Sequence, residues 1–289
     1  MGIGLHTGKP VRLSLKPAAA GHGIQFYRSD VGVTIPARLE NLARLDHATT
    51  LSADGVSIET VEHLLSALHG LGVDDALAQV DGPEVPILDG SAAPFVILIH
   101  EAGLRPLQTP REYLKVLAPV EVVRGTKSAR LTPSDQLRIS YTIGFDHPLL
   151  RHQAMSLRIS PDAYAEGIAP ARTFGFLRDV ETMRKSGLAL GGSLENAVVI
   201  GESGVLNNRL RFEDEFVRHK ILDAIGDLAL LGHPVVGHLE AVKAGHALHA
   251  ALAQKLLETP EAWELVAHPQ LPSLREPAGV PGRPRLEPA

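Results

Sequence analysis

The sequence predicts an α+β protein built from two related halves. Segments that alternate apolar and polar residues, as half-buried strands do, are mixed with segments whose apolar residues recur at helical spacing. A chain of 289 residues is long enough for about two domains. In addition, Val61-Glu62-His63 and Val217-Arg218-His219 each lead into a leucine-rich helix, a glycine and a strand. Two such halves would each offer one histidine to a site at their interface.

The N-terminal strands are predicted from alternation and from turn residues. Val11, Leu13 and Leu15 alternate with polar residues, and residues 24–27 are expected to pair with this strand. Asp54-Gly55 is typical of a two-residue hairpin turn. The strands that this turn would join are residues 49–51 and 56–58.

Two helices follow in the first half. The first is expected to begin at a capping Thr60 and to end at Gly70. A strand over residues 76–80 comes next, and Asp89-Gly90-Ser91 caps a second helix over residues 92–102. Strands and helices therefore alternate along the first hundred residues.

A proline-containing segment separates the halves. Residues 104–111 hold two prolines and form the expected linker, which gives an N-terminal α+β domain over 1–107 and a C-terminal α+β domain over 112–268. The segment from Thr259 holds seven of the chain's 21 prolines. We therefore expect residues 269–289 to be a disordered tail.

The second half repeats the mixture of strands and helices. Its first strands are predicted at residues 120–123, 129–131, 136–143 and 154–159. A loop is expected over 169–176, then a short helix over 180–186 that Gly187 ends. The remaining predicted elements are a strand at 198–200, a helix at 213–231 stopped by Gly232, a strand at 235–242 and a helix at 246–258.

Composition excludes several classes of function. The net charge of −5 offers no basic field for nucleic acid, and no apolar run approaches the ~18 residues that a membrane span needs. The start of the chain lacks the features of a secretory signal, so a cytoplasmic monomer with no stable membrane insertion is expected. The chain has no cysteine, so any zinc must be held by nitrogen and oxygen atoms.

The helix predicted over residues 213–231 carries the most informative polar face. His219, Lys220, Asp223 and Asp227 lie within about 100° of one another on a helical wheel, opposite an apolar sector. By itself this pattern is more typical of an amphipathic surface helix with a solvated charged face than of a functional site. The rest of the sequence has to decide between the two interpretations.

Together with residues of the first half, this face could form a catalytic zinc site. Such a site needs three protein ligands and one open position, and His219 and Asp223, at i and i+4, can bind one ion together. His63 could supply the third ligand, and Glu62 would then lie beside the attacking water as its base. The H-E-x-x-H motif of metalloproteases is absent.

Other polar residues could serve the same site. Lys220 suits an anionic group such as a phosphate, and Asp227 could orient the imidazole of His246. In the segment 172–176, the hydroxyl of Thr173 could donate to an oxyanion and Phe174 could face a ligand. The P-loop pattern is absent, so nucleotide hydrolysis gains no support.

Six motifs follow one another along the chain, up to about Trp263. They are Gly2-Ile3-Gly4-Leu5-His6-Thr7-Gly8, Thr60-Val61-Glu62-His63-Leu64, the segment 87–95, Ala171-Arg172-Thr173-Phe174-Gly175-Phe176, the run 210–228 and Lys243-Ala244-Gly245-His246-Ala247-Leu248. In register, these motifs closely resemble the LpxC family, the zinc-dependent UDP-3-O-acyl-N-acetylglucosamine deacetylases of lipid A biosynthesis.

The resemblance implies a role for each candidate residue. One zinc ion would be bound by His63, His219 and Asp223, with Glu62 as general base. It further implies that Thr173 supports the oxyanion and that Asp227 holds His246 as proton donor or electrostatic stabiliser. The substrate-binding residues that it implies are Lys220 and Lys243 at the nucleotide-sugar side, with Phe174 facing the ligand, and Leu177, Val180, Ala189 and Val199 around a passage for the acyl chain.

The family also implies a fold and a reaction. Each domain would be a layered unit of sheet and helix, with helices sandwiched between the sheets and the active site between the domains. The reaction would hydrolyse the N-acetyl group of UDP-3-O-(3-hydroxyacyl)-N-acetylglucosamine and release acetate, the committed step of lipid A biosynthesis. Two alternatives stay open: a zinc amidase of the same scaffold acting on another N-acyl amino sugar, and a nucleotide-sugar binding protein without catalysis.

Overall fold

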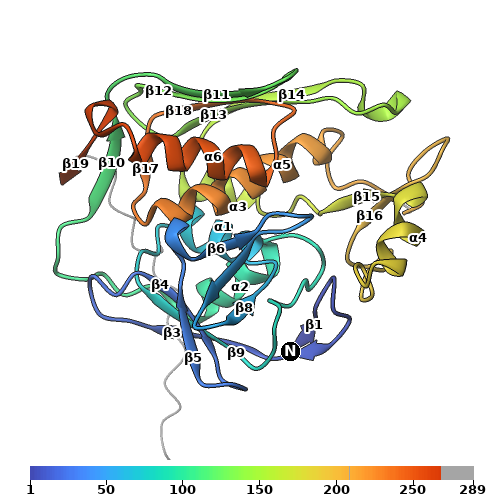
Figure 1. Cartoon of the computed structure of the whole chain (residues 1–289), viewed down its shortest axis with the longest axis horizontal. Helices are drawn as coiled ribbons and strands as arrows, with labels where there is room; N and C mark the ends of the chain where they lie inside the picture. The colour runs from blue at the N-terminus through green and yellow to red at the C-terminus, as the bar shows by residue number, and fades with distance from the viewer. Residues whose placement is uncertain (208, 268–289) are drawn as a thin grey trace, which may run out of the picture.

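The structure, a computed structural model, describes residues 1–207 and 209–267 and has the predicted α+β fold. Figure 1 shows two layers of strands on opposite sides of a layer of helices. The central helices are α1 (Glu62–Gly70), α5 (Glu215–Leu228) and α6 (His246–Leu257). A single apolar core runs through these layers and includes Phe26, Leu64, Ile221 and Leu252.

The main sheet of the first half has the strand order β3-β9-β4-β5. Its strands are β3 (Leu13–Pro17), β4 (Ile24–Arg28), β5 (Val33–Pro36) and β9 (Ala76–Val80). β9 is antiparallel to β3 and parallel to β4, so the predicted pairing of residues 24–27 with 11–15 is wrong. Alternation shows that a segment is a half-buried strand, but it does not show which strand lies beside it.

Smaller strands complete the first half. They are β1 (Gly2–Ile3), β2 (Pro10–Val11), β6 (Leu42–Arg44), β7 (Thr50–Ala53) and β8 (Val56–Ile58), with the short helix η1 (Leu39–Asn41). The predicted hairpin is confirmed, because β7 pairs with β8 and both Asp54 and Gly55 have positive φ.

The two predicted helices of the first half are present as α1 and α2 (Ala93–Ala102). The predicted cap at Thr60 is wrong, because Val61 precedes α1 and the hydroxyl of Thr60 donates instead to Glu84, at 2.9 Å. Thr60 has a φ of 57°, which turns the chain sharply into the helix.

The main sheet of the second half has the order β11-β12-β18-β13-β14. Its strands are β11 (Val120–Arg124), β12 (Lys127–Thr132), β13 (Arg138–Ile143), β14 (Gln153–Arg158) and β18 (His238–Val242). β18 is antiparallel to β12 and parallel to β13, as β9 is to β3 and β4. The order β3-β9-β4-β5 therefore recurs as β12-β18-β13-β14 with the same strand directions. The domain boundaries themselves stay a prediction.

Several elements of the second half differ from prediction. Residues 235–242 form two strands, β17 (Val235–Val236) and β18, which belong to different sheets and separate at Gly237. β17 pairs with β10 (Glu112–Val116), which also pairs with β19 (Trp263–Ala267); neither β10 nor β19 was predicted. At Gly237 the chain passes so close to Val116 that a Cβ would lie 2.7 Å from its Cγ2. This close passage marks the place where the chain moves from one sheet to the other.

The segment expected to be a loop over 169–176 contains a strand. β15 (Phe174–Phe176) pairs with β16 (Val198–Ile200), and α4 (Leu177–Lys185) begins directly after it, earlier than predicted. The helix α3 (Pro161–Gly167) was also not predicted. Short helices complete the half: η2 (Pro148–Leu150), η3 (Ala229–Leu231) and η4 (Pro260–Ala262).

Two sequence-based expectations concern membranes and the tail. None of the helices within residues 1–207 and 209–267 combines the length and apolar character needed to cross a membrane. The tail predicted over 269–289 lies outside the described residues.

Candidate active site

The helix α5 is buried on nearly all sides, so its polar face does not lie in solvent. His219, Asp223 and Asp227 are each about 2% exposed. The cause is the close packing of α5 on α1, where Gly226 lies against the backbone of Glu62 and a Cβ would lie 2.1 Å from the Glu62 carbonyl oxygen. The interpretation of this segment as a surface helix is therefore wrong.

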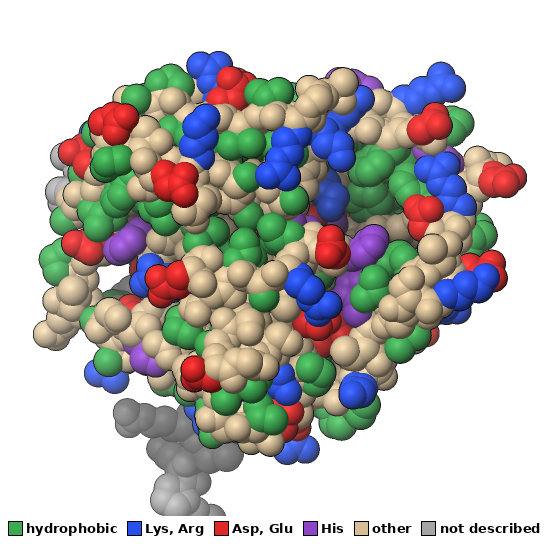
Figure 2. All heavy atoms as spheres, in the orientation of Figure 1, with side chains coloured by type: hydrophobic (Ala, Val, Ile, Leu, Met, Phe, Trp, Pro, Cys, Tyr) green, Lys and Arg blue, Asp and Glu red, His purple; other side chains and the backbone are tan. Residues whose placement is uncertain are grey.

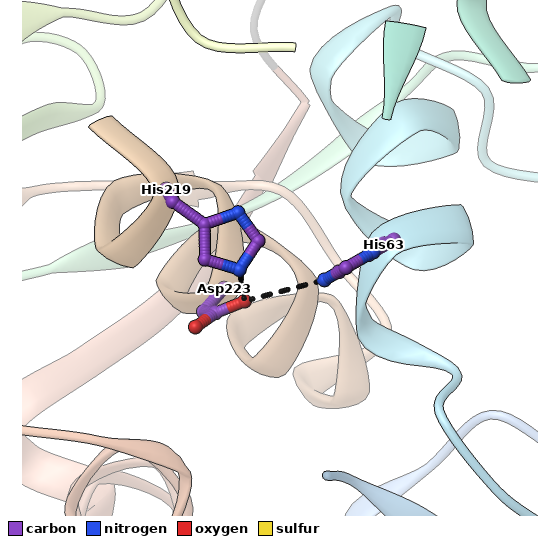
Figure 3. Close-up of side chains that lie close together, drawn as sticks. All are labelled: His63, His219 and Asp223. Carbon is purple, nitrogen blue, oxygen red and sulfur yellow. Dashed lines mark ion pairs between the residues drawn. The ribbon is translucent and has the colours of Figure 1, made fainter. Parts of the chain in front are cut away.

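Two histidines and one aspartate converge between α1 and α5 (Figure 3). The Nε2 atoms of His63 and His219 lie 3.7 and 3.3 Å from Oδ1 of Asp223. The two imidazoles meet edge to face with centroids 5.0 Å apart. One ligand atom from each residue lies within 4.8 Å of the others, so the three predicted metal ligands are brought together.

The electrostatics of this triad suit a divalent metal ion. Burial lowers the pKa of His63 to about 3 and also lowers the pKa of His219, so both rings are neutral and offer a lone pair. Burial alone would raise the pKa of Asp223, but its neighbours His219 and the cationic Lys220 hold it well below its usual range. Two neutral imidazoles and one carboxylate form the donor set of a catalytic zinc site.

The predicted base and acid, Glu62 and His246, lie near the triad and both contact Thr49. Burial raises the pKa of Glu62 to about 7, and its Oε2 accepts a hydrogen bond from the backbone N–H of Thr49 at 3.0 Å. Burial alone would lower the pKa of His246, but Asp227, with Oδ2 at 2.8 Å from Nδ1, raises it to about 9. The Nε2 of His246 lies 3.9 Å from Asp223. Near neutral pH, Glu62 can therefore take a proton while His246 holds one.

The segment around Thr173 lies against the face of α5 that carries His219. The carbonyl of Ala171 accepts a hydrogen bond from Nδ1 of His219 at 3.1 Å, which directs Nε2 toward Asp223. Thr173 itself is fixed by its backbone, which donates to Gly90 and accepts from Val198. The ring of Phe174 lies 6.1 Å from that of His219 and 5.6 Å from the ammonium of Lys220.

Lys220 and Lys243 lie on different elements. Lys220 donates to Asp223 at 2.7 Å, and although burial alone would lower its pKa, this pair raises it. Lys243 follows β18, has a φ of 48° and is exposed. A Cβ added at Gly144 would lie 2.8 Å from the Cε of Lys243, so the lysine side chain passes close to this glycine. Lys220 is thus tied to the triad, whereas Lys243 lies at the exposed end of β18.

The residues predicted for the acyl passage lie on a projecting part of the molecule. Leu177 and Val180 are in α4, Val199 is in β16, and the backbone N–H of Ala189 donates to His6 at 3.4 Å. In Figure 2 the face is hollowed to the right of its centre, with histidine and basic side chains in the hollow and hydrophobic ones beside it. The large apolar side chains exposed in this part are Leu177, Leu190, Leu194 and Leu206.

Sequence reasoning missed several buried residues of the site. His249 and Thr49 both contact Asp227, and Tyr141 contacts His249. The spacing His246-Ala-Leu-His249 was a usable signal, because residues at i and i+3 share one face of a helix. Thr49 and Tyr141 reach the site from β-rich segments distant in the sequence, so spacing could not have indicated them.

With this geometry established, comparisons with known proteins become informative. The family model described as LpxC, UDP-3-O-acyl N-acetylglycosamine deacetylase, matches residues 1–258. The chain belongs to the LpxC family. It is 53% identical to the UDP-3-O-acyl-N-acetylglucosamine deacetylase of Myxococcus xanthus, over 92% of this chain and 85% of that protein. Proteins of the same name from Anaeromyxobacter dehalogenans and Pseudomonas entomophila are 52% and 49% identical, over 92% of this chain and 86% and 89% of theirs.

Proposed function

We propose that this chain hydrolyses the N-acetyl group of UDP-3-O-acyl-N-acetylglucosamine in a zinc-dependent reaction that releases acetate, a step of lipid A biosynthesis. Membership of the LpxC family and the names of its relatives support the reaction. The observation that carries the proposal is the buried triad His63, His219 and Asp223 with Glu62 and His246 beside it. The cytoplasmic location and monomeric state expected from the sequence remain predictions.

The triad would hold the zinc ion, and its neighbours would move protons. A bound zinc ion polarises the amide carbonyl and lowers the pKa of water toward ~7. Glu62, whose pKa is raised to about 7, takes a proton from the attacking water. His246, kept protonated by Asp227, gives a proton to the departing amine. Thr173 is assigned to support the oxyanion that forms on the carbonyl oxygen.

The remaining candidate residues would bind the two ends of the substrate. Lys220, bound to Asp223, and Lys243, at the exposed end of β18, would contact the anionic nucleotide-sugar side, because lysine side chains bind phosphate groups. Phe174 and the apolar residues Leu177, Val180, Ala189 and Val199 would contact the acyl side. The exposed leucines around α4 and β16 support an apolar passage in this part of the molecule.

Metal analysis combined with an acetate-release assay tests the proposal. The purified protein should contain one zinc ion per chain and release acetate from UDP-3-O-acyl-N-acetylglucosamine. His219→Ala should lose the metal and the activity together, whereas Tyr164→Phe, a buried change outside the site, should retain both. A protein with bound zinc that releases no acetate would favour a different N-acyl amino sugar. Activity without any bound metal would overturn the zinc reaction.

A further inference from the structure

The carboxylate of Asp227 is held by three side chains, of which only His246 belongs to the proposed chemistry. Its Oδ2 lies 2.8 Å from Nδ1 of His246 and 2.8 Å from Nδ1 of His249. Its Oδ1 accepts a hydrogen bond of 2.6 Å from the hydroxyl of Thr49. Asp227 is 2% exposed, so these three side chains decide how its carboxylate is oriented.

Hydrogen-bond geometry determines the proton positions on His249. An ionised carboxylate only accepts hydrogen bonds, so Nδ1 of His249 must carry the proton that points to Asp227. In the neutral ring Nε2 is then an acceptor, and it lies 3.0 Å from the hydroxyl of Tyr141, which donates to it. Tyr141 and His249 are each about 1% exposed, so water does not replace either partner.

Metal binding by Asp227, His246 and His249 is the competing interpretation, because one atom from each lies within 4.8 Å of the others. The same geometry argues against it. Both Nδ1 atoms point to one carboxylate oxygen at hydrogen-bond distance, and the second nitrogen of His249 is already paired with Tyr141. The group is a chain of hydrogen bonds that runs from β13 through α6 to α5.

We propose that His249 is a positioning residue for the deacetylation reaction. By donating to Oδ2, it holds the carboxylate of Asp227 in the orientation that fixes the imidazole of His246 above the triad. Tyr141 keeps His249 in the tautomer that can donate. This inference rests on the proposed role of His246 as proton donor. It adds His249 and Tyr141, which affect His246 only through Asp227.

Substitutions of His249 separate positioning from packing. His249→Leu removes the donor to Asp227, whereas His249→Asn keeps an N–H donor on a shorter side chain. Tyr141→Phe removes one hydroxyl at nearly constant volume, so it tests the same chain without a cavity. Tyr164→Phe is the matched control, because Tyr164 is also buried and its hydroxyl donates to Ser66 at 3.0 Å, outside this chain.

The kinetic test uses the zinc-loaded protein and UDP-3-O-acyl-N-acetylglucosamine. His249→Leu should lower kcat by about 10- to 100-fold with KM and zinc content unchanged, and His249→Asn should recover most of that loss. Tyr141→Phe should lower kcat by a smaller factor, and Tyr164→Phe should leave it unchanged. Equal losses in the Asn and Leu variants, or wild-type kcat in His249→Leu, would overturn the inference.

A spectroscopic test does not depend on activity. In protein with ¹⁵N-labelled histidine, the Nδ1–H resonance of His246, assigned by its loss in His246→Gln, should be sharp in the wild type and in His249→Asn. It should broaden through exchange with water in His249→Leu. If this resonance were unchanged in His249→Leu, the inference would be overturned, whether or not the wild-type protein releases acetate. If the wild-type protein released no acetate, the proposed function alone would be overturned.

Discussion

Two side chains of the site, Glu62 and His246, have pKa values raised above their ordinary range. Burial raises the pKa of Glu62 to about 7, and Asp227, against the effect of burial, raises the pKa of His246 to about 9. Between these values Glu62 is ionised and His246 is protonated. These are the states that a base and an acid need at the start of amide hydrolysis.

The first prediction is a bell-shaped dependence of kcat/KM on pH. The rate should fall as pH drops through the pKa of Glu62, because the base becomes protonated, and fall as pH rises through the pKa of His246, because the acid loses its proton. A bound zinc dication disfavours the protonated form of both groups, so the limbs should lie at or below pH values of about 7 and 9. Steady-state kinetics across the pH range measure both limbs.

Substitutions show which residue is responsible for each limb of the pH dependence of kcat/KM. Glu62→Gln should remove the acidic limb and His246→Gln the alkaline limb, and replacement of either residue by alanine should lower the rate by roughly two to four decades in a folded protein. Retention of a near-full rate in either alanine variant would show that the roles are wrongly assigned.

At the scale of single residues, the candidate metal ligands are easier to predict from the sequence than the residues that position their neighbours. His219 and Asp223 were predictable because both lie on one helix at i and i+4. His63 and Glu62 were proposed from the weak match between Val61-Glu62-His63 and Val217-Arg218-His219, and the family resemblance then implied the same roles for them. Thr49 reaches Asp227 across 178 positions, and no local spacing encodes such a contact.

At the scale of elements, the site depends on how closely α1 and α5 approach each other. Gly226 lies in the last turn of α5, against the backbone of Glu62, and the two helices approach more closely there than any larger side chain would allow. Glu62 and His63, at the start of α1, are therefore placed next to His219 and Asp223. A glycine in a helix interior costs about 1 kcal/mol relative to alanine, and this contact offsets that cost.

The second prediction is that Gly226→Ala destabilises the protein and its metal site. A Cβ at 2.1 Å from the Glu62 carbonyl oxygen cannot be relieved by a side-chain rotation, so the helices must separate. We expect the free energy of unfolding to fall by about 1–3 kcal/mol despite the better helix propensity of alanine, and zinc affinity to fall with it. Denaturant unfolding and zinc titration measure the two effects.

Gly167→Ala, at the end of α3, is the control for this prediction. Its new Cβ would meet only the guanidinium of Arg218, at 3.4 Å, which can move aside. Its stability should stay within ~0.5 kcal/mol of the wild type. If Gly226→Ala behaved in the same way, close helix packing would not be what positions Glu62 and His63.

Elements were predicted more reliably than their pairing. The helices α1, α2, α5 and α6 were expected near their observed bounds, because periodicity and terminal glycines are local signals. β10 and β19 were missed because their place in the fold depends on pairing between segments far apart in the chain, which local patterns do not show. The division of residues 235–242 between two sheets depends on contacts with Val116, which no local pattern reports.

At the scale of the molecule, the two halves repeat one topology and contribute unequally to one site. Val61-Glu62-His63 lies at the start of α1, and the weakly matching Val217-Arg218-His219 lies in α5. In chain order, α1 comes before β9 and α5 comes before β18, and each of these strands has an internal position in its main sheet. In the sequence, only these two short segments indicate that the halves are related. The strand order of the two main sheets makes that relation evident. α1 brings one of the three candidate metal ligands, and α5 brings the other two.

The third prediction follows from this shared ligand set. An ion held by residues of both α1 and α5 binds only when the two helices are packed together, so zinc should stabilise the folded chain by mass action. At a free zinc concentration 100 times the Kd, the gain is about 2.7 kcal/mol, a rise in the unfolding temperature on the order of 5 °C. Calorimetry of the wild type with zinc and with a chelator measures this shift. The shift should disappear in His63→Ala but persist in His100→Ala, an exposed histidine at the end of α2. An equal shift in both variants would mean that the stabilising zinc binds elsewhere.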